Sequence, residues 1–199
     1  MRNLFYLLLF AVLFVSFSGC KNNDNVDEAW RTANANAYDA ITKNPAYHPI
    51  QTDDNTGPSG VYYKDISTIP DSLKGTVYPL QTSDVKILYK VTYCDSTVLD
   101  AGTSLNKVPI KIPVYDALGY TAGYGYGPIY YGLYQTPTPR GFSFALQHMV
   151  VGDKWEIWIP YYLAHGAIGL INSNYQTVIK GYTTLIFTVE LVGITEYPK

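Results

Sequence analysis

Residues that could bind a metal or attack a substrate are few in this chain and poorly placed for either role. The three histidines, His48, His148 and His165, show no spacing with cysteine or an acid that resembles a zinc site. Ser143 lacks the strand-turn-helix setting of a nucleophile elbow. The glycine-rich run 123–127 lacks the strand-to-helix setting of a phosphate loop. The sequence therefore predicts neither a metal nor a cofactor.

Tyrosine dominates the aromatic residues, with 20 tyrosines against seven phenylalanines and three tryptophans. Tyrosine combines a large contact area with a polar group, so it suits binding clefts and wet surfaces as well as cores. Residues 115–135 hold seven tyrosines and five glycines without a regular period. A loop of that length inside a compact domain is either functional or disordered.

The first twenty residues have the form of an export signal. Arg2 supplies a positive start, and Leu4 to Phe17 is an apolar run too short for a comfortable membrane span. The residues Ser18-Gly19-Cys20 resemble the cleavage box of bacterial lipoproteins, which predicts a signal peptide over 1–19 and lipid on Cys20. The alternative is an ordinary secretory signal with an incidental cysteine. Acyl chains on one cysteine would hold a domain at a membrane without a spanning helix.

Length and charge restrict the remaining 180 or so residues, 20–199, to about one domain. The formal net charge of −2 becomes about −3 without Arg2, which gives no indication of nucleic-acid binding. With Cys20 lipidated, Cys94 has no intrachain partner, so we expect a buried free thiol and no disulfide.

Hydrophobic periodicity predicts a short helix and a strand within residues 142–159. The apolar face of this helix consists of Phe142, Ala145, Leu146 and Met149, at i, i+3, i+4 and i+7. Gly152 is expected to end the helix, because glycine accepts a left-handed backbone. In the strand 154–159, Trp155, Ile157 and Ile159 fall on one face, and Pro160 ends it.

The other expected elements complete an α+β domain. A polar tether over 21–25 precedes a helix over 26–44, whose weak apolar stripe around Trp30 can pack on the domain or form a dimer with a second copy. Residues 47–59 and 168–181 are expected as loops, and strands are expected over 61–66, 77–80, 85–93, 107–114 and 184–194. The economical fold is one short helix against an antiparallel sheet of about five strands.

Residues 60–195 together resemble FKBP-type peptidyl-prolyl isomerases. Tyr89 and Asp100 take the place of an aromatic-aspartate pair, and Leu99 stands where a pocket phenylalanine is usual. The resemblance is carried further by Arg140-Gly141-Phe142, Met149 to Gly152, Lys154 to Pro160, Leu163 to Gly166, and Thr184 to Leu191. It implies an FKBP-like domain over 60–199 with an insertion at about 115–135, preceded by a tether and helix over 20–59.

The resemblance also implies a pocket for a proline ring. Phe142, where tryptophan is usual, and Phe187 would hold the ring, and Tyr89 and Asp100 would position the flanking carbonyl groups. His165, where tyrosine is usual, would donate a hydrogen bond. Further lining residues would be Leu99, Ile110 and Trp158. Each of these has a plainer interpretation as a core, turn or surface residue.

Three functions follow from these patterns. The first is a prolyl isomerase or folding helper, anchored by lipid on Cys20 in the outer membrane or periplasm of a bacterial cell envelope, that acts on proline-containing peptides or unfolded proteins. The second is a binding protein on the same fold with little catalysis, which Leu99, His165 and the tyrosine-rich insertion favour. The third is a lipoprotein that stacks sugars on exposed aromatic rings, such as Tyr120, Tyr124, Tyr126 or Trp158.

Overall fold

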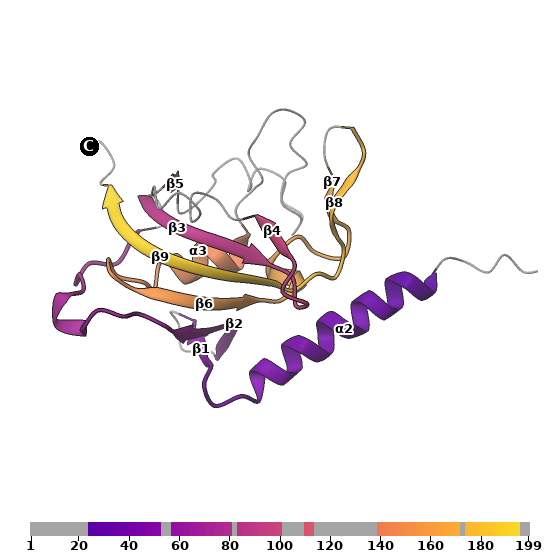
Figure 1. Ribbon diagram of the computed structural model, residues 1–199, viewed down its shortest axis with the longest axis horizontal. Coiled ribbons are helices and arrows are strands. Elements are labelled where there is room, and N and C mark those ends of the chain that lie inside the picture. The colour runs from indigo at the N-terminus through magenta and orange to yellow at the C-terminus, as the bar shows by residue number, and fades with distance from the viewer. Residues whose placement is uncertain are drawn as a thin grey trace, which may run out of the picture.

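The computed structural model of the chain describes residues 24–52, 57–80, 83–100, 110–113, 139–171 and 174–195. An antiparallel sheet of seven strands has the order β1-β2-β6-β9-β3-β4, and β5 also pairs with β3 (Figure 1). Its strands are β1 (His48–Gln51), β2 (Pro58–Asp65), β3 (Asp84–Thr92), β4 (Val98–Asp100), β5 (Ile110–Pro113), β6 (Lys154–Ile159) and β9 (Leu185–Thr195). A separate hairpin pairs β7 (Gly169–Ile171) with β8 (Thr177–Lys180).

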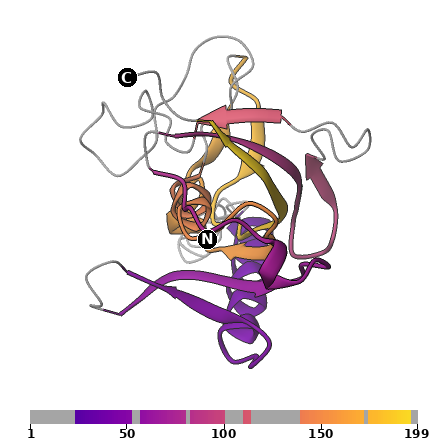
Figure 2. The ribbon, with the colours of Figure 1, turned by 90° about the vertical axis from the view of Figure 1, so that its left-hand side faces the viewer.

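The short helix α3 (Arg140–Leu146) packs on one face of this sheet, and the strands curve around it (Figure 2). All four residues of the expected helical face, Phe142, Ala145, Leu146 and Met149, are buried. Gly141 allows the close approach, because a Cβ atom there would lie 2.5 Å from Cγ2 of Ile159 in β6. A larger residue at position 141 would push the helix off the sheet.

The predicted fold class is confirmed, and β3, β6 and β9 lie within one residue of the predicted strands. The sheet has seven strands where about five were expected, because β1 lies in the expected loop 47–59 and β4 has only three residues. The hairpin β7–β8 replaces much of the expected loop 168–181, whereas residues 77–80 form no strand. Strand β2 begins at Pro58, so the sheet extends ahead of the domain start expected at residue 60.

The end of α3 also differs from the prediction. The helix stops at Leu146, Gln147 and His148 form a turn, and the amides of His148 and Met149 donate to carbonyl groups three residues back. Gly152 has a φ of +98°, as expected of the residue that redirects the chain into β6. The left-handed position was therefore predicted correctly, and the helix was predicted three residues too long.

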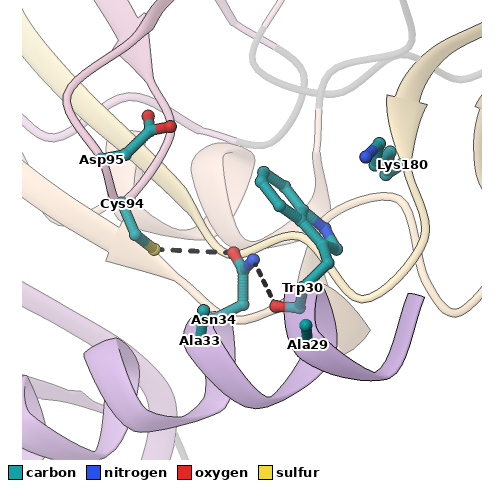
Figure 3. Close-up of a pocket in the computed structure, with 7 residues that line it drawn as sticks. All are labelled: Ala29, Trp30, Ala33, Asn34, Cys94, Asp95 and Lys180. Carbon is teal, nitrogen blue, oxygen red and sulfur yellow. Dashed lines mark hydrogen bonds between the residues drawn. The ribbon is translucent and has the colours of Figure 1, made fainter. Parts of the chain in front are cut away.

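The N-terminal helix α2 (Asp24–Thr42) packs against the domain through one face. Trp30 Nε1 donates to Thr183 Oγ1 (3.1 Å), and the Tyr38 hydroxyl donates to the carbonyl oxygen of Gly60 (2.6 Å). Between them, the buried side chain of Asn34 donates to the Trp30 carbonyl and accepts from the Cys94 thiol (Figure 3). The helix begins two residues earlier than predicted, so Asp24 and Asn25 belong to the helix and not to a tether.

The contact of α2 with the domain combines aromatic ring contacts, Trp30 with Tyr93 and Tyr38 with Tyr62, with hydrogen bonds of the buried Asn34. Besides the two bonds above, its Oδ1 accepts from the backbone amide of Thr184 at 2.8 Å, and Asn34 and Thr184 are each 2% exposed. Within the part of the chain that the structure describes, no helix is long and apolar enough to cross a bilayer.

Replacing Asn34 with alanine is expected to lower the free energy of unfolding by about 1–3 kcal/mol, because the buried Thr184 amide loses its acceptor. Urea unfolding measures the change. Asn36→Ala is the matched control, since Asn36 is exposed on the same helix, and it should change stability by less than about 0.5 kcal/mol. Because alanine favours a helix more than asparagine does, helix propensity acts against a loss in either variant. Equal changes in the two variants would contradict the role assigned to the Asn34 contacts.

Candidate active site

Two phenylalanine rings from distant parts of the chain stack at the start of α3. Phe142 in α3 and Phe187 in β9 have ring centroids 4.2 Å apart with planes 19° apart. They are 3% and 5% exposed, so the pair is the buried floor of its surroundings. The sequence predicted that these two residues share one site, and the structure brings them into contact.

The strands beside the pair carry the next two predicted residues. Phe187 lies opposite Val91 of β3, and Tyr89 is two residues from Val91, which places it on the same face and diagonal to Phe187. Tyr89 is partly buried against the core, as is Leu99 of β4. The backbone of Asp100 pairs with Val91, in the same row of the sheet as Phe187. The side chains of Asp100 and Ile110 lie outside the described part of the structure.

His165 follows the 3-10 helix η4 (Tyr161–Leu163), which lies against the start of α3. Leu163 is the link, because its Cβ would be 3.2 Å from a Cβ atom on Gly141. Burial lowers the pKa of His165 to about 4, so the ring is neutral at pH 7. A neutral imidazole has one donor and one acceptor nitrogen, so His165 is able to donate the hydrogen bond expected of it.

Trp158 does not join these residues. In β6 the buried side chains are Trp155, Ile157 and Ile159, and Trp158 points to the opposite face. There its Nε1 donates to Glu156 Oε1 (2.9 Å), and its ring meets the edge of Tyr47. The expectation that Trp158 lines the proline pocket therefore conflicts with the alternation of its own strand.

Several predicted features fall on residues outside the described ranges. They are the signal peptide 1–19, the lipidation site Cys20 and the insertion at about 115–135. The one described cysteine, Cys94, is a free thiol whose pKa is raised to about 11 by burial and the nearby Asp95. Among the described residues, no three His, Cys, Asp or Glu side chains are grouped in a way that could hold a metal ion.

Comparison with known proteins decides the family. The model of the family described as FKBP-type peptidyl-prolyl cis-trans isomerase matches residues 75–192, more than half of the chain. The chain belongs to this FKBP-type family. The match spans β3 to β9 and includes both rings of the stacked pair.

Two curated proteins are similar in sequence to this FKBP-type chain. One is the macrophage infectivity potentiator of Trypanosoma cruzi, 40% identical over 57 residues, which are 29% of this chain and 26% of that protein. The other is the FKBP-type 22 kDa peptidyl-prolyl cis-trans isomerase of Escherichia coli K12, 30% identical over 116 residues, or 58% of this chain and 43% of that protein. The chain thus matches less than half the length of either relative.

Solved structures show the same FKBP-like fold. A peptidyl-prolyl cis-trans isomerase from Pseudomonas syringae pv. tomato has a TM-score of 0.58 at 20% identity, covering 85% of this chain and 96% of its own. FkpA from Escherichia coli also has a TM-score of 0.58, at 17% identity, covering 88% of this chain and 65% of its own. At these identities the likeness concerns the fold alone.

One polar atom of the FKBP-type domain was missed from the sequence. Trp155 was interpreted as a core residue, but its Nε1 is buried with no hydrogen-bond partner within the described structure. The sequence did contain a signal: a tryptophan on the buried face of a strand carries an indole N–H into the core, where it usually finds an acceptor. The atom therefore requires an explanation beyond core packing.

The lowered pKa of His165 predicts a pH-dependent stability. The unfolded state binds a proton near the ordinary histidine pKa of about 6.5, while the folded state resists protonation until about pH 4. The contribution of His165 to the free energy of unfolding should therefore be fully present above pH 6.5 and fall by about 2 kcal/mol as the pH is lowered to 4. This value is smaller than the two pKa values alone would give, because the ring is partly exposed to solvent.

The variant His165→Tyr should remove this decline, and thermal unfolding between pH 4 and 7 measures it. The control His48→Tyr changes an exposed histidine and should keep the wild-type profile. A profile that is the same in wild type and His165→Tyr would contradict the assigned burial of His165.

Proposed function

We propose that this FKBP-type chain is a peptidyl-prolyl cis-trans isomerase that acts on proline-containing peptides or unfolded proteins. The observation that carries the proposal is the stacked pair of Phe142 and Phe187, with Tyr89 diagonal to it on the same sheet face. Family membership supports it, as does the peptidyl-prolyl isomerase activity for which the Escherichia coli relative is named.

The apolar floor supplies the proposed chemistry. Rotation of an Xaa-Pro bond faces a barrier of roughly 20 kcal/mol, because it breaks the amide resonance. The twisted amide is less dipolar than the planar one, so an apolar site binds it better and lowers the barrier. No nucleophile or metal takes part in such a step.

The side chains around the floor would hold the substrate. Phe142 and Phe187 would contact the proline ring, and Tyr89 and Asp100 would orient the carbonyl groups on either side. His165, neutral at pH 7, would donate a hydrogen bond. Leu99 packs beside the core and would form a thinner wall than the usual phenylalanine. Ile110 would line the pocket from β5.

A protease-coupled assay on an Xaa-Pro peptide tests the activity. At micromolar concentration the protein should shorten the time constant of cis/trans exchange well below the tens of seconds of the free peptide. An unchanged rate would contradict the proposal.

We further propose that the chain is a lipoprotein of a bacterial cell envelope, held at the outer membrane or in the periplasm by lipid on Cys20. The run Leu4 to Phe17 and the small residues before Cys20 support this. Expression of the full chain with Cys20→Ala should move the protein from the detergent phase to the aqueous phase after Triton X-114 partition. Cys94→Ala is the matched control and should stay in the detergent phase, because it removes a free cysteine and keeps Cys20.

A second candidate is a binding protein of the FKBP-type family with weak catalysis. Leu99 and His165 favour it, because each replaces an aromatic side chain of the usual pocket. Peptide binding without rate acceleration in the coupled assay would support this candidate over the isomerase.

Dimerisation through α2 stays a prediction that sedimentation analysis would test. Trp30, Asn34 and Tyr38 of this helix already contact the domain of their own chain.

A further inference from the structure

A cleft of about 710 Å³ lies at the opposite end of α3 from Phe142. Its walls come from β1, β2, β6, the segment after η1 (Asp71–Leu73), and the turn between α3 and β6. The residues that matter for its chemistry are Tyr63, Asp71, Lys74, Tyr78 and Trp155. The isomerase mechanism uses none of them.

The aromatic wall contains a buried donor without an acceptor. The rings of Tyr63 and Trp155 stack with centroids 4.0 Å apart and planes 27° apart. Trp155 is 6% exposed, and no acceptor among the described residues faces its Nε1. Such a donor is costly to bury alone, so the site favours a ligand with an acceptor such as a peptide carbonyl oxygen.

The rim is acidic. Lys74 Nζ lies 2.8 Å from Asp153, 2.9 Å from Asp65 and 3.1 Å from Asp71, so one ammonium group faces three carboxylates. The side chain of Asp71 is 95% exposed, whereas that of Lys74 is only 8% exposed. The cleft therefore favours a cation, which can also contact the faces of aromatic rings.

The edge of the sheet borders the same cleft. Among the described strands, β1 pairs with β2 alone, and Pro49, Ile50 and Gln51 of β1 line the cleft. An unpaired strand edge is a template for an extended polypeptide. Tyr78, 58% exposed, adds further aromatic surface to the lining of the cleft.

We propose that this cleft binds an extended polypeptide segment in which a lysine or arginine adjoins a large apolar side chain. The apolar side chain lies against Tyr63, Trp155 and Tyr78, a backbone carbonyl accepts from Trp155 Nε1, and the cation lies near Asp71. The choice of polypeptide as occupant rests on the proposed function, but the binding itself requires no proline. It would hold an unfolded chain while its Xaa-Pro bonds reach the stacked pair.

The test uses a short proline-free peptide of alternating leucine and lysine, so a failed isomerase assay leaves its result intact. Titration into the full-length protein, followed by ¹⁵N NMR, should shift the indole N–H resonance of Trp155 as it gains an acceptor. Trp155→Phe keeps a ring and removes the donor, and should weaken binding about fivefold. Asp71→Asn should weaken the lysine peptide by about threefold and leave a leucine-serine peptide unchanged.

Two exposed tyrosines, one in the cleft and one away from it, provide a test variant and a matched control. Tyr78→Ala should weaken binding about fivefold, whereas Tyr175→Ala, at a residue 79% exposed on the β7–β8 hairpin, should bind as the wild type does. An unmoved Trp155 indole resonance at saturating peptide would overturn the proposal, as would equal binding by the two tyrosine variants. Equal affinity for a leucine-glutamate peptide would overturn the assigned cation.

Discussion

Replacing Phe142 with leucine is expected to lower kcat/KM for an Xaa-Pro peptide by about tenfold, equivalent to about 1.4 kcal/mol of transition-state stabilisation. Leucine is close enough in volume to keep α3 against the sheet, but it removes the flat ring that stacks 4.2 Å from Phe187. The coupled peptide assay at several substrate concentrations measures the change.

The control for this substitution is Phe144→Leu, the same exchange two residues along the same helix. Phe144 is only partly buried and its ring contacts His148, away from the stacked pair. It should therefore keep the wild-type kcat/KM. Equal losses in the two variants would mean that α3 acts through packing in general, and wild-type activity in Phe142→Leu would remove the ring from the mechanism.

Replacing Lys74 with methionine is expected to lower the free energy of unfolding by about 3–5 kcal/mol, because the change leaves buried carboxylate charge without its partner. Asp153 is 5% exposed and accepts from the backbone amide of Val150 as well as from Lys74. Burial acts to lower the pKa of Lys74, but the hydrogen bonds of Asp153, Asp65 and Asp71 outweigh it and raise the pKa. The amine is therefore charged at pH 7.

Urea unfolding with two further variants separates charge from packing. Lys154→Met is the matched control, since Lys154 is 41% exposed and lies 3.5 Å from Glu190, and it should cost less than about 1 kcal/mol. The double variant Lys74→Met/Asp153→Asn should recover part of the loss, because asparagine keeps an acceptor for Val150 and carries no charge. A loss below that of Lys154→Met would contradict the role assigned to the Lys74 cluster.

The periodicity of apolar residues predicted the strands and the helix that are long enough to show it. The alternation of Val85, Ile87 and Val91 predicts β3, and the i, i+3, i+4, i+7 spacing after Phe142 predicts α3 and its buried face. The same alternation in β6 assigns Trp158 to the face opposite Ile157. The period of the strand therefore argued against Trp158 as a pocket residue before the structure was known. The prediction of Trp158 as a pocket residue gave the family resemblance more weight than the strand period.

Contacts between distant residues left no local signal. Asn34 joins α2 to Thr184, 150 residues along the chain, and Lys74 joins η1 to Asp153. Short elements such as β1 and β4 exist because neighbouring strands supply their partners, and their three or four residues are too few to show a period. The stacking of Phe142 on Phe187 was predicted through family resemblance, since 44 intervening residues separate elements that periodicity alone does not bring together.

Exchange spectroscopy tests the central claim most directly. An Xaa-Pro peptide labelled next to the proline is mixed with a small fraction of wild-type protein, and cis and trans signals are followed by NMR. With the wild-type protein we expect exchange cross-peaks that correspond to cis/trans exchange on a subsecond time scale. With Phe142→Leu we expect an exchange rate about tenfold lower. Exchange that remains at the tens of seconds of the free peptide would contradict the account.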